Sequence, residues 1–200
     1  FANVDVMDIE VDAESTEEFV QTVKNISPTF GGINLEDIAA PRCFEIEETL
    51  KKQLNIPVFH DDQHCTAIII AAGLLNALEI SGREIEKTHI VCLGAGAAGI
   101  AAMRMLKSLG ARKIYLVDRK GVVYNGREEV NKYKQEFSRE SSRRTLADAM
   151  KDADVFIGVS GPNLLKPEML ETMSDKPIVF ALSNPDPEIN PELAMKTRSD

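Results

Sequence analysis

Two pairs of adjacent carboxylates are the residues of this chain best suited to chemistry. Asp61-Asp62 follows the apolar run 57–60, and Glu36-Asp37 follows the strand-like segment 29–35. Neighbouring ionised side chains repel each other and lose hydration near a core, so a cation is expected to compensate them. Carboxylate oxygens suit the hard cations Mg²⁺ and Mn²⁺, and three of them with substrate oxygens and water would complete an octahedral shell. Spacing alone does not choose between Asp61 and Asp62.

Two other interpretations of this region stay open. His60, His64 and Cys65, together with Cys43, have the side chains of a zinc site. The interleaved Asp-Asp pair and the lack of a C-x-x-C pair count against zinc, and Cys65 is also explained as a small packing residue. The acids can equally be solvated loop residues without any ligand.

A glycine-rich loop indicates a dinucleotide site. The pattern G-x-G-x-x-G lies between a predicted strand at 89–93 and a predicted helix that ends near Leu109. Its glycines allow a tight turn, a close approach of the backbone to a pyrophosphate, and packing of helix on strand, while the helix N-terminus attracts phosphates. The residues predicted to bind the cofactor here are Gly94, Ala95, Gly96, Ala97, Ala98 and Gly99.

An acid at the end of the next predicted strand bears on the choice of cofactor. Asp118 stands about 20 residues beyond the glycine loop, where a carboxylate accepts hydrogen bonds from the adenine ribose. This position favours NAD. Arg119 and Lys120 follow directly and can pair with a 2′-phosphate, so NADP stays open. The alternative is that Asp118 is only a strand-end turn residue.

Two further loops follow predicted strands at 154–160 and 177–182. In open α/β sheets, ligands bind beside the carboxyl ends of the strands, which is where Ser160 and Asn184 are expected. The Asn184 amide can donate and accept hydrogen bonds, so it suits a nicotinamide carboxamide or a substrate carboxylate. An Asn-Pro turn without a ligand is the alternative.

The elements that would position these groups form two predicted domains. Residues 1–80 are predicted to be part of a smaller α/β domain, and residues 81–200 to be a Rossmann-type doubly wound parallel sheet. The helix expected at 66–78 is apolar nearly all round, which is typical of a buried helix. The other predicted elements with a bearing below are a strand at 4–11, helices at 15–25 and 42–53, and a charged helix at 128–139.

Composition excludes several classes of partner. The chain has 200 residues, a net charge of −9 and no block of Lys and Arg, which argues against nucleic acid. The longest apolar run, 67–75, is shorter than the roughly 20 residues of a membrane span. The three widely spaced cysteines and the absence of a secretory segment indicate a reducing, cytoplasmic compartment.

Five segments together resemble a bacterial-type malic enzyme. They are Gly31–Ile38, Val58–His64, Gly94–Gly99, Val117–Gly121 and Ala181–Pro185, and the similarity extends over essentially the whole chain. The resemblance implies oxidative decarboxylation of L-malate to pyruvate and CO₂ with reduction of NAD or NADP. It also implies a homodimer or a larger homo-oligomer.

The resemblance assigns roles to the acids. It implies that Glu36, Asp37 and Asp62 bind Mg²⁺ or Mn²⁺, and that Asp61 acts in catalysis close to the family's lysine. Asn184 would touch substrate or nicotinamide.

Two departures from the family pattern leave other hypotheses open. Cys65 stands where the family motif Asp-Asp-Gln-His-Gly-Thr has glycine. The family's general-acid tyrosine and general-base lysine are expected upstream of Phe1, so the chain is expected to be a piece that lacks the N-terminal part. A non-catalytic nucleotide-binding fragment, or another metal-assisted hydroxy-acid dehydrogenase, are the alternatives.

Overall fold

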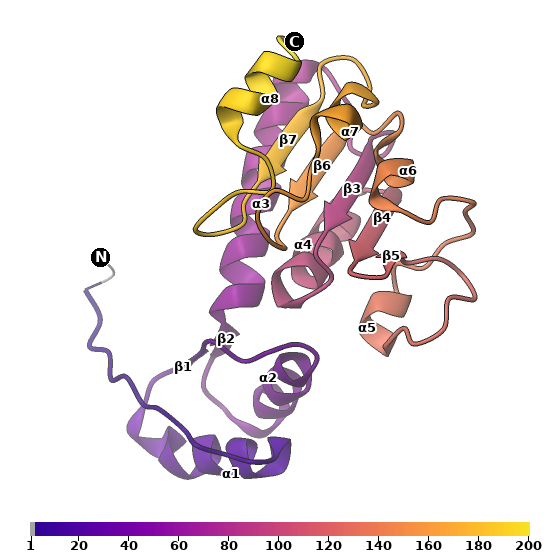
Figure 1. Ribbon diagram of the computed structural model, residues 1–200. Coiled ribbons are helices and arrows are strands. Elements are labelled where there is room, and N and C mark those ends of the chain that lie inside the picture. Colours follow the sequence, from indigo (N-terminus) through magenta and orange to yellow (C-terminus); the bar gives the residue numbers. More distant parts are fainter. Residues whose placement is uncertain (1–2) are drawn as a thin grey trace. The chain divides into compact units, whose positions relative to one another are not determined.

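The computed structural model describes residues 3–200 and divides into two compact units (Figure 1). Unit 1 ends at Asp61, and unit 2 is Asp62–Asp200. The sequence placed the boundary after residue 80, with the long apolar helix in the first domain. In the structure almost all of that helix belongs to unit 2, because it packs against the larger sheet.

Unit 1 pairs two helices with two short strands. Helix α1 (Thr16–Ile26) begins as predicted at Ser15, whose hydroxyl accepts the Glu18 N–H at 3.1 Å. A 3₁₀ turn, η1 (Ser27–Thr29), follows. The remaining elements are β1 (Ile33–Leu35), the predicted α2 (Arg42–Gln53) and β2 (Val58–His60), and the two strands are parallel. Their core is Val20, Val23, Leu35, Ile46, Leu50 and Val58.

The strand predicted at 4–11 is wrong. This segment has no regular secondary structure, and its apolar side chains are exposed, Val6 at 84% and Met7 at 69%. Alternating apolar and acidic residues match the two-residue period of a strand, but a strand also needs a partner to satisfy its backbone groups. None of the residues described pairs with this segment.

The long apolar helix α3 (Asp61–Ser81) starts earlier than predicted, at the acid pair itself. Asp61 and Asp62 therefore lie in its first turn, where negative charge is favourable. The prediction that this helix is buried on all sides is wrong, because only one face of α3 is buried. Leu74 is fully buried and Gly73 packs on the Phe180 ring, whereas Ile69 is 69% exposed on the other face.

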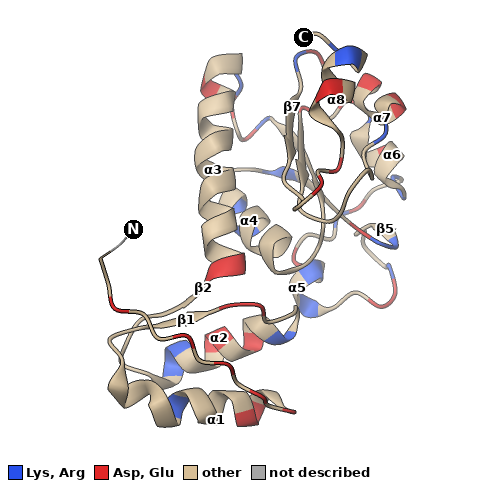
Figure 2. Cartoon of the chain, turned by 60° about the vertical axis from the view of Figure 1, so that its left-hand side comes forward, with Lys and Arg blue, Asp and Glu red and all other residues tan. Residues whose placement is uncertain are grey.

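By length and composition, α3 could cross a membrane, which differs from the expectation based on residues 67–75. Figure 2 shows the helix without a charge between Asp62 and Glu79. This is weak evidence for a membrane span, because core helices of soluble proteins have the same properties. Here α3 covers one face of a sheet, although only 28% of its apolar window is buried.

Unit 2 is built on a five-stranded sheet in the order β5-β4-β3-β6-β7. All neighbours are parallel except β5, an unpredicted antiparallel edge strand. Because β3 lies between β4 and β6, the chain runs outward from the sheet centre in both directions, as in a doubly wound fold. The strands are β3 (His89–Leu93), β4 (Lys113–Asp118), β5 (Gly121–Val122), β6 (Val155–Gly158) and β7 (Ile178–Ala181).

Helices cover both faces of this sheet (Figure 2). Helices α3 and α4 (Ala97–Ser108) lie on one side, and α6 (Leu146–Met150) and α7 (Pro167–Glu171) on the other. Helix α8 (Pro191–Thr197) packs beside α7. The charged helix predicted at 128–139 is wrong in extent, since only α5 (Lys132–Gln135) forms.

Candidate nucleotide and metal sites

The turn between β3 and α4 is packed so closely that two of its glycines cannot carry side chains. Gly94 has φ +120°, and a Cβ there would lie 2.6 Å from the Val159 carbonyl oxygen. A Cβ on Gly99 would overlap the Gly94 carbonyl oxygen. These contacts press the start of α4 onto the end of β3, which is the packing expected of the first and third glycines in a dinucleotide turn.

The middle glycine differs because it faces open space. Apart from its two neighbours in the chain, no described residue has an atom within 4 Å of a Cβ built on Gly96. Gly96 is the N-cap of α4 and supplies no side-chain hydrogen bond to the helix. The first-turn N–H groups of α4 are therefore not capped by Gly96, so this surface fits a phosphate group. Ala95, Ala97 and Ala98 lie beside it in the same turn.

Asp118, the predicted ribose acceptor, is held by cations at the end of β4. Arg127 donates to both carboxylate oxygens, with Nη1 3.0 Å from Oδ1 and Nη2 2.6 Å from Oδ2. Lys134 Nζ lies 2.7 Å from Oδ2, and the Lys120 N–H lies 2.9 Å from Oδ1. Burial raises the pKa of Asp118, but the hydrogen bonds from Arg127 and Lys134 outweigh burial and lower this pKa to about 2.

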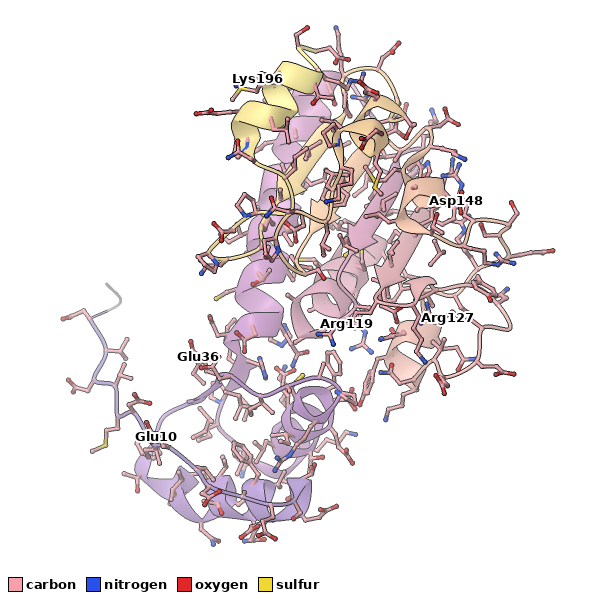
Figure 3. All side chains as sticks on the ribbon, in the orientation of Figure 1. Glu10, Glu36, Arg119, Arg127, Asp148 and Lys196 are labelled. Atoms are coloured by element: carbon pink, nitrogen blue, oxygen red, sulfur yellow. The ribbon has the colours of Figure 1, made fainter. Side chains whose placement is uncertain are left out.

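Asp118 and the two cations that hold it, Arg127 and Lys134, form a cluster that we name the Asp118 bracket. This cluster was not predicted, because the cations stand 9 and 16 residues away from Asp118 in the sequence. The sequence does not single out Arg127, and Lys134 lies in the charged helix predicted at 128–139. Their spacing carries no periodic signal, and it is β5 and α5 that bring both to Asp118. The one available signal was the number of cations that follow an isolated strand-end acid. Arg127 lies beside α5 in Figure 3.

The two cations that directly follow Asp118 behave differently from each other. Lys120 forms an ion pair with Glu129. Arg119 is exposed, and within residues 3–200 no carboxylate lies within salt-bridge distance of it. Of the two cations predicted to pair with a 2′-phosphate, Arg119 is therefore the better candidate, because Lys120 is already paired with Glu129.

The loops after β6 and β7 start at the same edge of the sheet. Gly158 of β6 is the register partner of Ala181 of β7, and Ser160 and Asn184 follow a few residues later. The Ser160 N–H donates to the Glu188 carboxylate at 2.8 Å, a contact that the sequence did not predict. Asn184 is exposed. Contact of Ser160 and Asn184 with a cofactor stays a prediction.

The two acid pairs leave the same edge of the small sheet in unit 1. Leu35 and His60 are register partners at the ends of β1 and β2, so Glu36 and Asp61 each follow the same end. Asn34 Nδ2 donates to Glu36 Oε2 at 3.3 Å, and Asp37 adopts φ +55°, which aspartate tolerates better than most residues. Asp62 follows Asp61 by one peptide bond.

Within the described part of the chain, no three His, Cys, Asp or Glu side chains are grouped closely enough to hold a metal ion. This holds for the predicted set of Glu36, Asp37 and Asp62. It holds equally for the alternative zinc ligands. The metal assignment stays a prediction.

Cys65, the departure from the family motif, is accommodated without strain. It is exposed on α3, inside regular helix, where the backbone accepts any side chain that avoids the preceding turn. Cys65 therefore fits the regular helix of this chain.

Comparison with known families gives two matches along the chain. Residues 64–198 match the family model described as "Malic enzyme, NAD binding domain". Residues 5–51 match "Malic enzyme, N-terminal domain". The two matches correspond to the two compact units.

Individual relatives agree with these matches. The chain is 57% identical to an NADP-dependent malic enzyme of Halomonas elongata, over 100% of the chain and 48% of that protein. It is 51% identical to an NAD-dependent malic enzyme of Rhizobium meliloti, over 100% of the chain and 26% of that protein. The chain thus spans half or less of the length of these relatives.

A solved structure agrees with the fold as well. An NAD-dependent malic enzyme from Thermotoga maritima superposes with a TM-score of 0.95 at 44% identity, covering 98% of this chain and 54% of that one. The match includes the glycine turn and the doubly wound sheet, since nearly the whole chain is covered.

Proposed function

Because the chain belongs to the malic enzyme family, we propose that it supplies the cofactor and metal sites for oxidative decarboxylation of L-malate to pyruvate and CO₂, with reduction of NAD(P)⁺. The observation that carries the proposal is the packed turn between β3 and α4. Its first and third glycines are fixed by contacts, while Gly96 alone faces open space at an uncapped helix N-terminus. Such a surface accepts a dinucleotide pyrophosphate.

The residues of unit 2 would bind and orient the cofactor. The N–H groups of Ala97 and Ala98 would donate to the phosphates, and the positive end of α4 would favour their charge. Asn184 would meet the nicotinamide carboxamide or the substrate carboxylate. Malate C2 can transfer hydride only if the nicotinamide is held at a fixed distance from it, so orientation is the main contribution of this unit.

We also propose that Glu36, Asp37 and Asp62 hold the divalent ion. The support is the all-oxygen character of the donor set, which suits Mg²⁺ or Mn²⁺, and the common edge from which the two acid pairs leave β1 and β2. When bound, the ion supplies Lewis-acid polarisation of the substrate oxygens. Asp61 would influence the proton chemistry from the neighbouring position.

The metal assignment is tested in the full-length protein that contains this chain. Asp62→Asn is expected to lower Mn²⁺-dependent malate oxidation by at least about 100-fold, because one of three anionic ligands becomes neutral. Asp8→Asn, an exposed acid in the segment before α1, is the matched control and should keep full activity. An Asp62→Asn protein with unchanged Mn²⁺ dependence would contradict the assignment.

We further propose that the adenine-ribose end of the site accepts NADP⁺. The negative charge of Asp118 is balanced by Arg127 and Lys134, so it does not oppose a 2′-phosphate as a bare strand-end carboxylate would. Arg119 adds an exposed cation next to it. The Halomonas elongata relative is NADP-dependent, whereas the Rhizobium meliloti relative described above is NAD-dependent.

Calorimetry with the two cofactors tests this choice. Lys134→Ala should weaken NADP⁺ binding by about tenfold, which is ~1.4 kcal/mol, and leave NAD⁺ binding within about twofold. Lys196→Ala on α8, labelled in Figure 3, is the control for loss of an exposed lysine. Equal losses for both cofactors would show that Lys134 does not discriminate between them.

A non-catalytic nucleotide module is the second candidate. It is favoured by one observation, that all the predicted nucleotide-binding residues lie within the unit Asp62–Asp200. Release of CO₂ from malate by the full-length protein would exclude this candidate. CO₂ release would also exclude a hydroxy-acid dehydrogenase that stops at the keto acid.

We propose a cytoplasmic location and a homodimer or larger homo-oligomer, with L-malate as the small-molecule partner. All three cysteines are free thiols, two buried and one exposed, which suits a reducing compartment. Light scattering of the full-length protein would test the oligomeric state.

A further inference from the structure

Glu188 is a fully buried acid whose carboxylate holds two loops. It has 0% exposure and lies seven residues beyond the end of β7. Its Oε1 accepts the Ser160 N–H at 2.8 Å, and its Oε2 accepts the Ser183 N–H at 3.2 Å. Within the residues described, no lysine, arginine or histidine forms an ion pair with it. Two backbone donors on two different oxygens are therefore its polar partners in this structure.

The position of this carboxylate follows from the strand register. Gly158 and Ala181 are paired at the ends of β6 and β7, and the Leu182 N–H still donates to the Gly158 carbonyl at 2.9 Å. Ser160 and Ser183 come next along the two chains. Both of their N–H groups donate to Glu188, so the carboxylate bridges the two chains just beyond the end of their ladder.

The Glu188 carboxyl group occupies the space that a side chain at Gly158 would need. A Cβ on Gly158 would overlap the carboxyl carbon of Glu188 and lie 2.5 Å from its Oε2. The backbone of Glu188 makes a second contact between the two loops, because the Leu165 N–H donates to the Glu188 carbonyl at 2.9 Å. Glu188 thus fixes the spacing between the loop after β6 and the loop after β7.

These two loops lie on one half of the nucleotide site. In a doubly wound sheet a dinucleotide crosses the carboxyl edge, with its pyrophosphate at the central glycine turn. Asp118, at the end of β4, is on one side of the turn after β3, while β6 and β7 are on the other side. Since Asp118 marks the adenine-ribose side, Ser160, Ser183 and Asn184 belong to the nicotinamide side.

We propose that Glu188 is a positioning residue for the nicotinamide half of the cofactor. By holding the Ser160 and Ser183 N–H groups, it presets the loops that carry Ser160 and Asn184 before the cofactor binds. This inference rests on the proposed nucleotide site. It assigns Glu188 no contact with the reacting atoms.

The test compares a whole dinucleotide with its adenine half. Glu188→Gln keeps the size of the side chain but turns an NH₂ group toward one of the two N–H donors. We expect it to weaken binding of NAD⁺ and NADP⁺ by about tenfold and to leave ADP binding within about twofold. Isothermal calorimetry on the full-length protein that contains this chain measures all three ligands. Glu192→Gln, an exposed acid on α8, is the matched control and should change none of them.

The outcomes separate this inference from the proposed function. If the unsubstituted full-length protein binds neither NAD⁺ nor NADP⁺, the nucleotide site itself is wrong. If it binds them and folded Glu188→Gln binds them equally well, or loses ADP to the same extent, the positioning role is overturned. If Glu188→Gln does not fold, Glu188→Asp takes its place, because it keeps the charge but is too short to reach both donors. Failure of both variants to fold would make Glu188 a stability residue and overturn the inference.

Discussion

His89 is a buried histidine at the start of β3, at the opposite end of the strand from the glycine turn. Its Nδ1 lies 3.0 Å from the Asp152 carbonyl oxygen, and because a carbonyl only accepts, Nδ1 carries the proton. Nε2 is then the acceptor that faces Arg143 Nη1 at 3.5 Å. Burial, followed by the charges of Lys113 and Arg143, lowers the pKa of His89 to about 4.

This neutral histidine predicts a loss of stability in mild acid. Between pH 6.5 and about 4 the unfolded chain binds a proton on His89 that the folded chain does not bind. The free energy of unfolding therefore falls as the pH decreases through this window, by an amount on the order of 2–3 kcal/mol. Urea unfolding measures this free energy at pH 7 and at pH 5. The decrease between the two pH values should be smaller in His89→Gln than in the parent chain. Equal differences would contradict the prediction.

The chemistry of single residues was predictable where it depended on neighbours in the sequence, and not where it depended on the fold. The acid pairs and the strand-end position of Asp118 are visible in the sequence. The partners of Asp118 are not, because Arg127 and Lys134 approach it only through β5 and α5. Glu188 had no signal either, since its donor Ser160 stands 28 residues earlier.

The turn between β3 and α4 is the element that the sequence specified most completely. A strand, a G-x-G-x-x-G pattern and a helix follow one another without a long-range requirement, so local geometry is enough to form it. Its contacts separate two kinds of glycine. Gly99 is required by packing, and Gly96 is required only by the ligand.

Two alanine substitutions should show this difference. Gly99→Ala forces a methyl group into the Gly94 carbonyl, so it should destabilise the chain by about 1–3 kcal/mol and also abolish NAD(P)⁺ binding. Gly96→Ala meets no protein atom and should leave thermal unfolding unchanged while it weakens NAD(P)⁺ binding. Calorimetry and thermal melts on both variants measure the two effects. Destabilisation by Gly96→Ala comparable to that by Gly99→Ala would refute the assignment.

Two predicted elements, the strand at 4–11 and the helix at 128–139, did not form as predicted. In both, a local sequence pattern is not supported by contacts with the rest of the fold. The alternation at 4–11 is strand-like, but no described strand pairs with it. The charged segment at 128–139 forms only one turn of helix, α5, which Asn131 caps by accepting the Lys134 N–H at 3.0 Å. By contrast, α1 and α2 formed over the predicted residues, because an N-cap or an apolar face supports each of them.

At the scale of the whole molecule, the nucleotide residues are contained in one unit. The glycine turn, the Asp118 bracket, and the loops joined by Glu188 all lie within Asp62–Asp200. The core of the sheet belongs to the same unit, with Val91, Phe156 and Met150 fully buried.

We therefore expect a chain of residues 62–200 to fold and bind NAD(P)⁺ by itself. Its affinity should be within about threefold of that of the 200-residue chain, a difference below 1 kcal/mol, because no nucleotide residue is lost. Circular dichroism and calorimetry measure folding and binding. A chain that folds without binding would show that residues before Asp62 complete the nucleotide site.

The space shared by Gly158 and Glu188 also constrains how this sequence can change over generations. A side chain gained at 158 would collide with the carboxylate, and a shorter side chain at 188 would leave the Ser160 and Ser183 N–H groups without this acceptor. Each substitution alone removes or crowds this contact, so we expect the two positions to change together. Among descendants of this protein, a residue larger than glycine at 158 should occur together with loss of the acid at 188.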